Sequence, residues 1–208
     1  NAQIAQGHLA EARAAAEAVE KGRPNMALGF YLTGLVDERD QKPVPAELAY
    51  ERALKLEPGA GDPLTAVTLL NLRTKQSGKA LQRLDAIIAT QPTNVTARNL
   101  KGEVLLFAGR LDAAQAVFQE TVQASPTLAS AYRGLAMAQL ASKRTDDAAR
   151  TLQQGIAKAG DASALVAGDR QRTERHALID LDAIADHAGL ADHDPGAVVD
   201  EEGLADPR

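Results

Sequence analysis

The sequence has no cysteine and no tryptophan, and only six of its 208 residues are phenylalanine or tyrosine. Without cysteine the chain has no disulfide framework, no thiolate metal site and no cysteine nucleophile. Its apolar runs are far shorter than the roughly 18 residues that would indicate a membrane-spanning helix. What remains is 45% hydrophobic and 25% charged, and it is long enough to bury a core in one or two domains.

Charge is divided unevenly along the chain. Residues 1–162 carry 19 Lys or Arg and 17 Asp or Glu, whereas residues 163–208 carry 4 and 11, so the net charge of −5 arises in the last quarter. The near-neutral body has no basic stripe of the kind that follows nucleic-acid phosphates. We therefore expect no nucleic-acid partner.

A regular 34-residue period runs through the sequence. Prolines recur at this spacing at Pro24, Pro58, Pro92 and Pro126. Alanine, the most frequent residue of the chain, keeps the same period at Ala12, Ala46, Ala80, Ala114 and Ala148. Two residue types that share one period indicate a repeated structural unit of that length.

Each unit has the pattern of two amphipathic helices. With the proline at unit position 32, position 8 holds mostly small residues, namely Gly34, Thr68, Gly102 and Ala136. Position 24 holds mostly large ones, namely Ala16, Tyr50, Leu84, Phe118 and Leu152. Small residues facing large ones predict that two helices approach closely within a unit.

Helix-boundary signals divide the units further. They predict helices near 8–21, 27–37, 45–56, 62–74, 78–90, 95–107, 111–124, 129–142 and 145–158. The second helix of each unit is expected to end before its proline, and Pro45 fits the first turn of a helix. The charged stretch from Asp37 to Val44 is predicted to be a longer loop within its unit.

This pattern resembles the tetratricopeptide repeat (TPR) family, whose 34-residue helix–turn–helix unit has small residues at positions 8 and 20 and a proline at 32. The best match is "NVTARNLKGEVLLFAGRLDAAQAVFQETVQASPT", followed by "LASAYRGLAMAQLASKRTDDAARTLQQGIAKAG". The resemblance implies an all-α, right-handed superhelical solenoid of tandem repeats. The expected organisation is the second helix of a truncated repeat at 1–26, full repeats at 27–60, 61–94, 95–128 and 129–162, a capping helix or degenerate repeat at 163–188, and a disordered acidic tail at 189–208.

In this family the first helix of each repeat lines a concave groove through unit positions 2, 5, 9 and 12. The resemblance implies other proteins or peptides as partners, and these groove candidates: Tyr31, Leu35, Thr65, Leu69, Leu72, Asn99, Glu103, Arg133 and Met137. The same positions include Leu28, Glu38 and Leu140. Positions 5 and 9 do not provide the Lys/Asn/Arg clamp with which the family's chaperone adaptors grip a carboxylate, so acidic chaperone tails are not the expected partners.

No catalytic, cofactor or metal site is predicted. The string "DHAGLADHD" gathers Asp186, His187, Asp192, His193 and Asp194, but its spacing matches no ligand signature, and a solvated acidic segment is expected there. There is no G-x-S-x-G elbow, and "GAGD" at 59–62 lacks the Lys-Ser/Thr of a phosphate loop. Leu35 and Leu69 interrupt any code of polar, base-reading side chains for RNA.

The alanine-rich strings, including "KRTDDAARTLQ", also resemble the TPR lipoproteins of PEP-CTERM/exosortase loci. That resemblance implies a bacterial scaffold for exopolysaccharide export, in the periplasm or at the outer membrane rather than in the cytoplasm. Two alternatives remain: a cytoplasmic adaptor or secretion chaperone, and a TPR regulatory arm of an enzyme such as a glycosyltransferase. The sequence begins at Asn1 rather than Met, as is expected of a fragment or of a processed segment.

Overall fold

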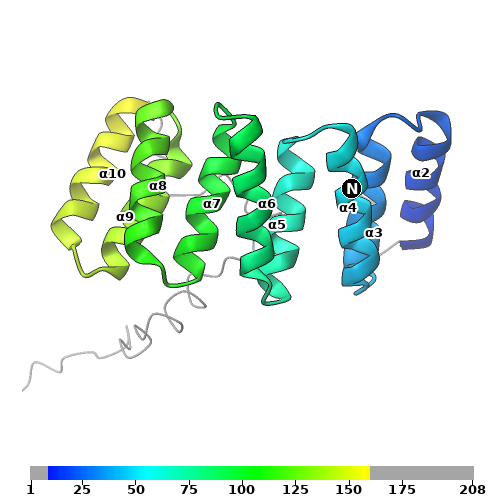
Figure 1. Cartoon of the computed structure of the whole chain (residues 1–208), viewed down its shortest axis with the longest axis horizontal. Helices are drawn as coiled ribbons and strands as arrows, with labels where there is room; N and C mark the ends of the chain where they lie inside the picture. The colour runs from blue at the N-terminus through cyan, green and yellow to red at the C-terminus, as the bar shows by residue number, and fades with distance from the viewer. Residues whose placement is uncertain (1–8, 160–208) are drawn as a thin grey trace, which may run out of the picture.

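The computed structural model describes residues 9–159, in which nine α-helices and no strand are found (Figure 1). The helices are α2 Leu9–Gly22, α3 Ala27–Arg39, α4 Pro43–Leu56, α5 Gly61–Arg73, α6 Ser77–Thr90, α7 Val95–Phe107, α8 Leu111–Ala124, α9 Ala129–Ala141 and α10 Thr145–Ala159. The predicted all-α solenoid is confirmed. The segments 163–188 and 189–208, with the cluster from Asp186 to Asp194, lie outside the described residues.

The helices follow one another in chain order along the long axis, with α2 at one end and α10 at the other (Figure 1). Each helix packs on the next in sequence, and α3, α5, α7 and α9 also contact one another in turn. These four are the first helices of their units, and we call them the A helices; α2, α4, α6, α8 and α10 are the B helices. Within residues 9–159 no helix is both long enough and apolar enough to cross a bilayer.

The proline period marks the ends of the B helices. α4 ends at Leu56, α6 at Thr90 and α8 at Ala124, each two residues before its proline. A proline lacks the N–H that would continue the helix, and it disfavours helical backbone in the residue before it. The sequence prediction of these boundaries is confirmed.

Close approach of the two helices in a unit depends on glycine. A Cβ placed on Gly34 would overlap the Tyr50 ring, and one placed on Gly102 would lie 2.6 Å from the Phe118 ring. A Cβ on Gly134 of the next unit would overlap the same Phe118 ring. Both rings are fully buried. The aromatic rings therefore occupy space that only glycine leaves open.

The second unit fills the same register with a larger residue at position 8 and a smaller one at position 24. Thr68 stands at position 8 and Leu84 at position 24, and both side chains are fully buried. Every alanine of the 34-residue period from Ala12 to Ala148 is also buried. The periodic alanines and the paired side chains at positions 8 and 24 thus contribute to the core of the solenoid.

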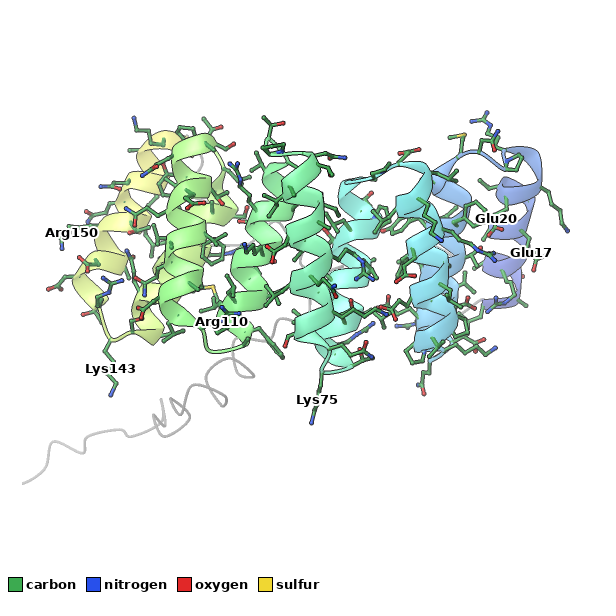
Figure 2. The ribbon with its side chains drawn as sticks, in the orientation of Figure 1. Glu17, Glu20, Lys75, Arg110, Lys143 and Arg150 are labelled. Atoms are coloured by element: carbon green, nitrogen blue, oxygen red, sulfur yellow. The ribbon has the colours of Figure 1, made fainter. Side chains whose placement is uncertain are left out.

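All four turns within the units have one backbone design. Position 15 has a positive φ in each, with values of 57° at Gln41, 58° at Lys75, 69° at Gly109 and 59° at Lys143. The next residue donates its N–H to the carbonyl five residues earlier, as from Gln76 to Asn71 at 2.6 Å. This pattern closes the end of an α-helix. Lys75 and Lys143 project from the same edge of the solenoid (Figure 2).

The predicted loop from Asp37 to Val44 is wrong. α3 continues to Arg39 and α4 begins at Pro43, which leaves only residues 40–42 between the helices. Asp37 is buried because Arg13 of α2 donates a hydrogen bond to it at 2.8 Å, and the same guanidinium reaches Asp40 at 3.3 Å. Arg13 thus holds Asp37 and Asp40 at the end of α3, whereas the sequence pattern predicted that these charges lie in a solvent-exposed loop.

Candidate functional site

The predicted groove residues all lie on the A helices, but they differ in exposure. The buried ones are Tyr31, Leu69, Leu72 and Asn99, and the half-buried ones are Leu35, Thr65, Glu103, Arg133 and Met137. We call these nine side chains, with Leu28 and Leu140, the A-helix surface. Leu28 and Leu140, near its two ends, are each 46% exposed.

The buried apolar members belong to the core between helices. Tyr31 packs with Tyr50, with ring centroids 6.0 Å apart, in a cluster that Leu35 borders. Leu72 lies in a second cluster with Leu84 and Val104, and Met137 borders a third. These side chains pack against neighbouring helices, whereas Thr65, Glu103 and Arg133 are polar and only half-buried.

Asn99 has one end of its amide in use. Its Nδ2 donates to Glu103 Oε1 at 2.7 Å, one helical turn further along α7. Its Oδ1 is buried and accepts no hydrogen bond, and it is the one such side-chain atom in residues 9–159. A buried carbonyl without a partner costs about 1–3 kcal/mol, so each such group in a folded chain requires a reason.

Glu38, at position 12 of the first unit, is held on both sides. The Tyr50 hydroxyl donates to Glu38 Oε2 at 2.6 Å, and the Arg73 guanidinium of α5 binds the other carboxylate oxygen. Burial, followed by the neighbouring Glu38 charge, raises the pKa of Tyr50 far above its usual range. Tyr50 therefore stays a neutral donor, and Glu38 joins the first unit to the second rather than standing ready for a ligand.

A second polar cluster joins α4, α5 and α6. The amide of the fully buried Asn71 donates to Glu47 at 2.5 Å and accepts from Arg83 at 2.7 Å. Arg83 also donates to Glu51 at 2.8 Å, and Lys79 pairs with Glu47 at 2.8 Å. Burial alone would raise the pKa of Glu47, but the hydrogen bonds from Lys79 and Asn71 and the charges of Lys79 and Arg83 lower it overall.

Two cavities lie on either side of α6. One, of about 250 Å³, is lined by residues of α4 and α6 that include Leu54, Arg83 and Ile87. The other, of about 300 Å³, is lined by residues of α6, α7 and α8 that include Leu81, Leu105 and Val117. No predicted groove residue lines either cavity. The sequence analysis missed both cavities, and Thr68 and Leu84, the pair at positions 8 and 24 of this unit, are fully buried and line neither of them.

Nowhere in residues 9–159 do three or more His, Cys, Asp or Glu side chains gather to hold a metal ion. Asp146 and Asp147 lie in the first turn of α10, where the helix dipole stabilises negative charge. The A-helix surface combines half-buried apolar side chains with amide, hydroxyl and charged groups, the mixture typical of protein interfaces.

Comparison with known proteins agrees with this architecture. Two tetratricopeptide repeat models match the chain, one over residues 1–63 and 72–129 and the other over residues 105–168. The uncharacterized protein y4yS of Sinorhizobium fredii is 36% identical over 84 residues, which are 38% of this chain and 46% of y4yS. The chain thus spans less than half the length of that relative.

Several solved structures share the fold. YrrB, described as a TPR protein with an unusual peptide-binding site, is 20% identical with a TM-score of 0.53, over 82% of this chain and 88% of its own. A MamA structure is 19% identical with a TM-score of 0.56, over 75% and 91%. MamA from Desulfovibrio magneticus, residue 41 to its end, is 18% identical with a TM-score of 0.56, over 81% and 91%. At these identities the likeness shows the fold alone, but because one repeat model matches more than half of the residues, the chain belongs to the tetratricopeptide repeat family.

Proposed function

We propose that the protein is a non-catalytic scaffold that binds a peptide segment of another protein along its A-helix surface. Membership of a family whose repeats serve protein–protein interaction is the observation that carries this proposal. YrrB, with the same fold, is described as having a peptide-binding site, which supports a peptide as the ligand.

The exposure pattern refines where the peptide would bind. Leu28 and Leu140 offer exposed apolar area near the two ends, and Thr65, Glu103 and Arg133 offer half-exposed polar groups between them. Apolar contact supplies most of the affinity of such a surface, and polar groups set the register of the bound chain. The buried Tyr31, Leu69 and Leu72 act through the packing of the A helices.

The test uses half-exposed residues, because truncating the buried ones would disturb the core. The full chain is panned against a phage-displayed library of random twelve-residue peptides, and the affinities of selected peptides are measured by calorimetry. The double variant Thr65→Lys/Arg133→Glu should weaken the selected peptides by roughly tenfold or more, which is about 1.4 kcal/mol. The control Gln82→Lys/Lys158→Glu introduces the same charges at exposed positions on the B helices α6 and α10.

The two variants separate the outcomes. Equal binding by the control and the wild type, with weakened binding by the A-helix variant, supports the proposal. Binding lost only in the B-helix variant would move the site to the other face. Failure of the library to yield any peptide that depends on the chain would overturn the peptide-binding function.

We further propose a role in bacterial exopolysaccharide assembly, which rests on the resemblance of the alanine-rich strings to the PEP-CTERM lipoproteins. This role would locate the protein in the periplasm or at the outer membrane. Cell fractionation with an antibody to the full protein, together with polysaccharide yield in a deletion strain, tests both. The full reading frame separates this role from its rivals. A lipobox cysteine upstream favours the envelope scaffold, an initiator Met the cytoplasmic adaptor or secretion chaperone, and a catalytic domain the enzyme arm.

A further inference from the structure

Two buried asparagines in neighbouring units have opposite hydrogen-bond status. Asn71, on α5, is 1% exposed, and Asn99, on α7, is 8% exposed. Asn71 uses both ends of its amide, donating to Glu47 and accepting from Arg83. Asn99 uses only its nitrogen, which donates to Glu103, and its Oδ1 has no partner.

The contrast separates a structural role from a binding role. Asn71 sits between an acid and a base from two other helices, so the fold explains it completely. The fold explains only half of Asn99, because an apolar side chain of the same size would fill its place without burying a lone carbonyl. Departures of this kind in a folded chain are expected where a ligand supplies the missing partner.

The chemistry of the site defines that partner. The Asn99 amide nitrogen is already engaged, so the group that remains is an acceptor, and the adjacent Glu103 carboxylate adds an acceptor and a negative charge. Such a pair favours a positively charged donor over a carboxylate. The charge preference is the reverse of that of the carboxylate clamp, whose full set of residues positions 5 and 9 do not provide.

We propose that Asn99 and Glu103 form a subsite that receives a lysine or arginine side chain of the bound peptide. The inference rests on the proposed peptide-binding function and places the basic residue of the peptide against α7, in the third unit. The Asn99 Oδ1 has almost no accessible surface. Binding therefore requires the amide to turn about its Cβ–Cγ bond so that Oδ1 reaches the A-helix surface. The turn gives up the hydrogen bond from the amide nitrogen to Glu103, and the cation of the peptide replaces that donor at the Glu103 carboxylate.

The experiment is a double-mutant cycle between the chain and its peptide. The probes are the peptides selected by panning against the wild-type full chain, each also made with its Lys or Arg replaced by Gln. Against the wild-type chain, at least one Lys or Arg of a selected peptide should matter by roughly tenfold, as expected for a charge-assisted hydrogen bond. Against Asn99→Leu, the same replacement should change the affinity by less than about twofold.

Thermal unfolding supplies the control for folding. Asn99→Leu loses one bond to a half-exposed acid and relieves a lone buried carbonyl, so its Tm should stay within about 2 °C of the wild-type value. Asn71→Leu leaves Glu47 and Arg83 without their shared partner, and its Tm should fall by roughly 5 °C or more. Equal losses of Tm in the two variants would show that Asn99 is structural and would overturn the subsite.

The remaining outcomes separate the two proposals. If Asn99→Leu weakens peptides equally with and without their basic residue, the donor is the peptide backbone, and the basic subsite is overturned. Peptides that depend on Thr65 and Arg133 but not on Asn99 would overturn the subsite and leave the binding function standing. A library that yields no binders would overturn both.

Discussion

The first two full units and the last two are held together by different forces. In α3–α6, ion pairs cross between units: Arg73 binds Glu38, and Arg83 lies among Glu47, Glu51 and Asn71. Among the described ion pairs, those with both partners in α7–α10 link Asp147 to Arg144 and Arg150, three residues away in the sequence. The two units of this half are joined instead by the Phe118 ring, which lies against Gly102 and Gly134. One 34-residue period therefore supports two kinds of interface, one sensitive to charge and one to volume.

The largest expected effect is on the volume-dependent interface. Phe118→Ala removes a fully buried ring that lies against glycines of two units, and we expect a loss of roughly 3–5 kcal/mol in the free energy of unfolding. Urea unfolding measures the loss, and hydrogen exchange locates it. Exchange should rise in α7–α10 much more than in α3–α6, and an equal rise in both halves would contradict the division.

A paired substitution sharpens the same point. Gly102→Ala places a Cβ 2.6 Å from the Phe118 ring, and overpacking of this kind costs about 1–3 kcal/mol. Adding Phe118→Leu replaces the ring with the leucine that the second unit has at position 24, where position 8 holds Thr68 rather than glycine. The double variant should recover part of the loss caused by Gly102→Ala, and simple additivity of the two losses would mean that the two positions do not share space.

The charge-dependent interface should respond to the loss of Arg83. Arg83→Met keeps much of the side-chain volume. It leaves Glu47, Glu51 and the side-chain oxygen Oδ1 of Asn71 without the guanidinium that they share. Breaking a largely buried ion cluster costs about 3 kcal/mol. Arg150→Met, at an exposed pair within α10, is the control and should cost less than about 1 kcal/mol.

Acid should weaken the same interface. The pKa of Glu47 in the folded chain is lowered from its ordinary value of 4.5, so its contribution is fully present above that value. The contribution is lost as the pH falls through the lowered pKa, because the folded state then has to take up the proton. Urea titrations from neutral pH downward should show a shallower acid decline for Glu47→Gln than for the wild type, with the exposed Glu120→Gln as control.

The smallest expected effect lies in the turns within the units. Lys75 in the first half and Gly109 in the second have the same positive-φ backbone, which glycine adopts without strain. Relief of backbone strain in Lys75→Gly should stabilise the chain by about 0.5–1 kcal/mol, and the greater conformational entropy of glycine in the unfolded chain offsets part of this gain. Gly109→Ala should destabilise the chain by a similar amount. Thermal unfolding checks both, and a fall in Tm for Lys75→Gly would show that the turn is not strained.

Local patterns in the sequence predicted most of the fold. The proline and alanine periods placed the helices to within a few residues, because each unit packs mainly on its neighbours in sequence. The error at Asp37 arose because its partner, Arg13, is 24 residues away on another helix. No local pattern shows such a contact.

The candidate site was less open to prediction. Unit positions assigned Tyr31, Leu69 and Asn99 to one helical face, but their burial depends on how closely successive A helices pack. The status of the Asn99 carbonyl and the cavities beside α6 are likewise properties of three-dimensional packing.

The ring of Phe118 also sets how the solenoid comes apart. Repeat proteins unfold as a row of units, each with its own stability and an interface term to the next. Because one side chain completes the close packing of α7 and also lies against Gly134 of α9, the third and fourth units share a stabilising term that neither has alone. We expect the boundary between folded and unfolded chain to avoid this junction, so that the two units melt as one cooperative block.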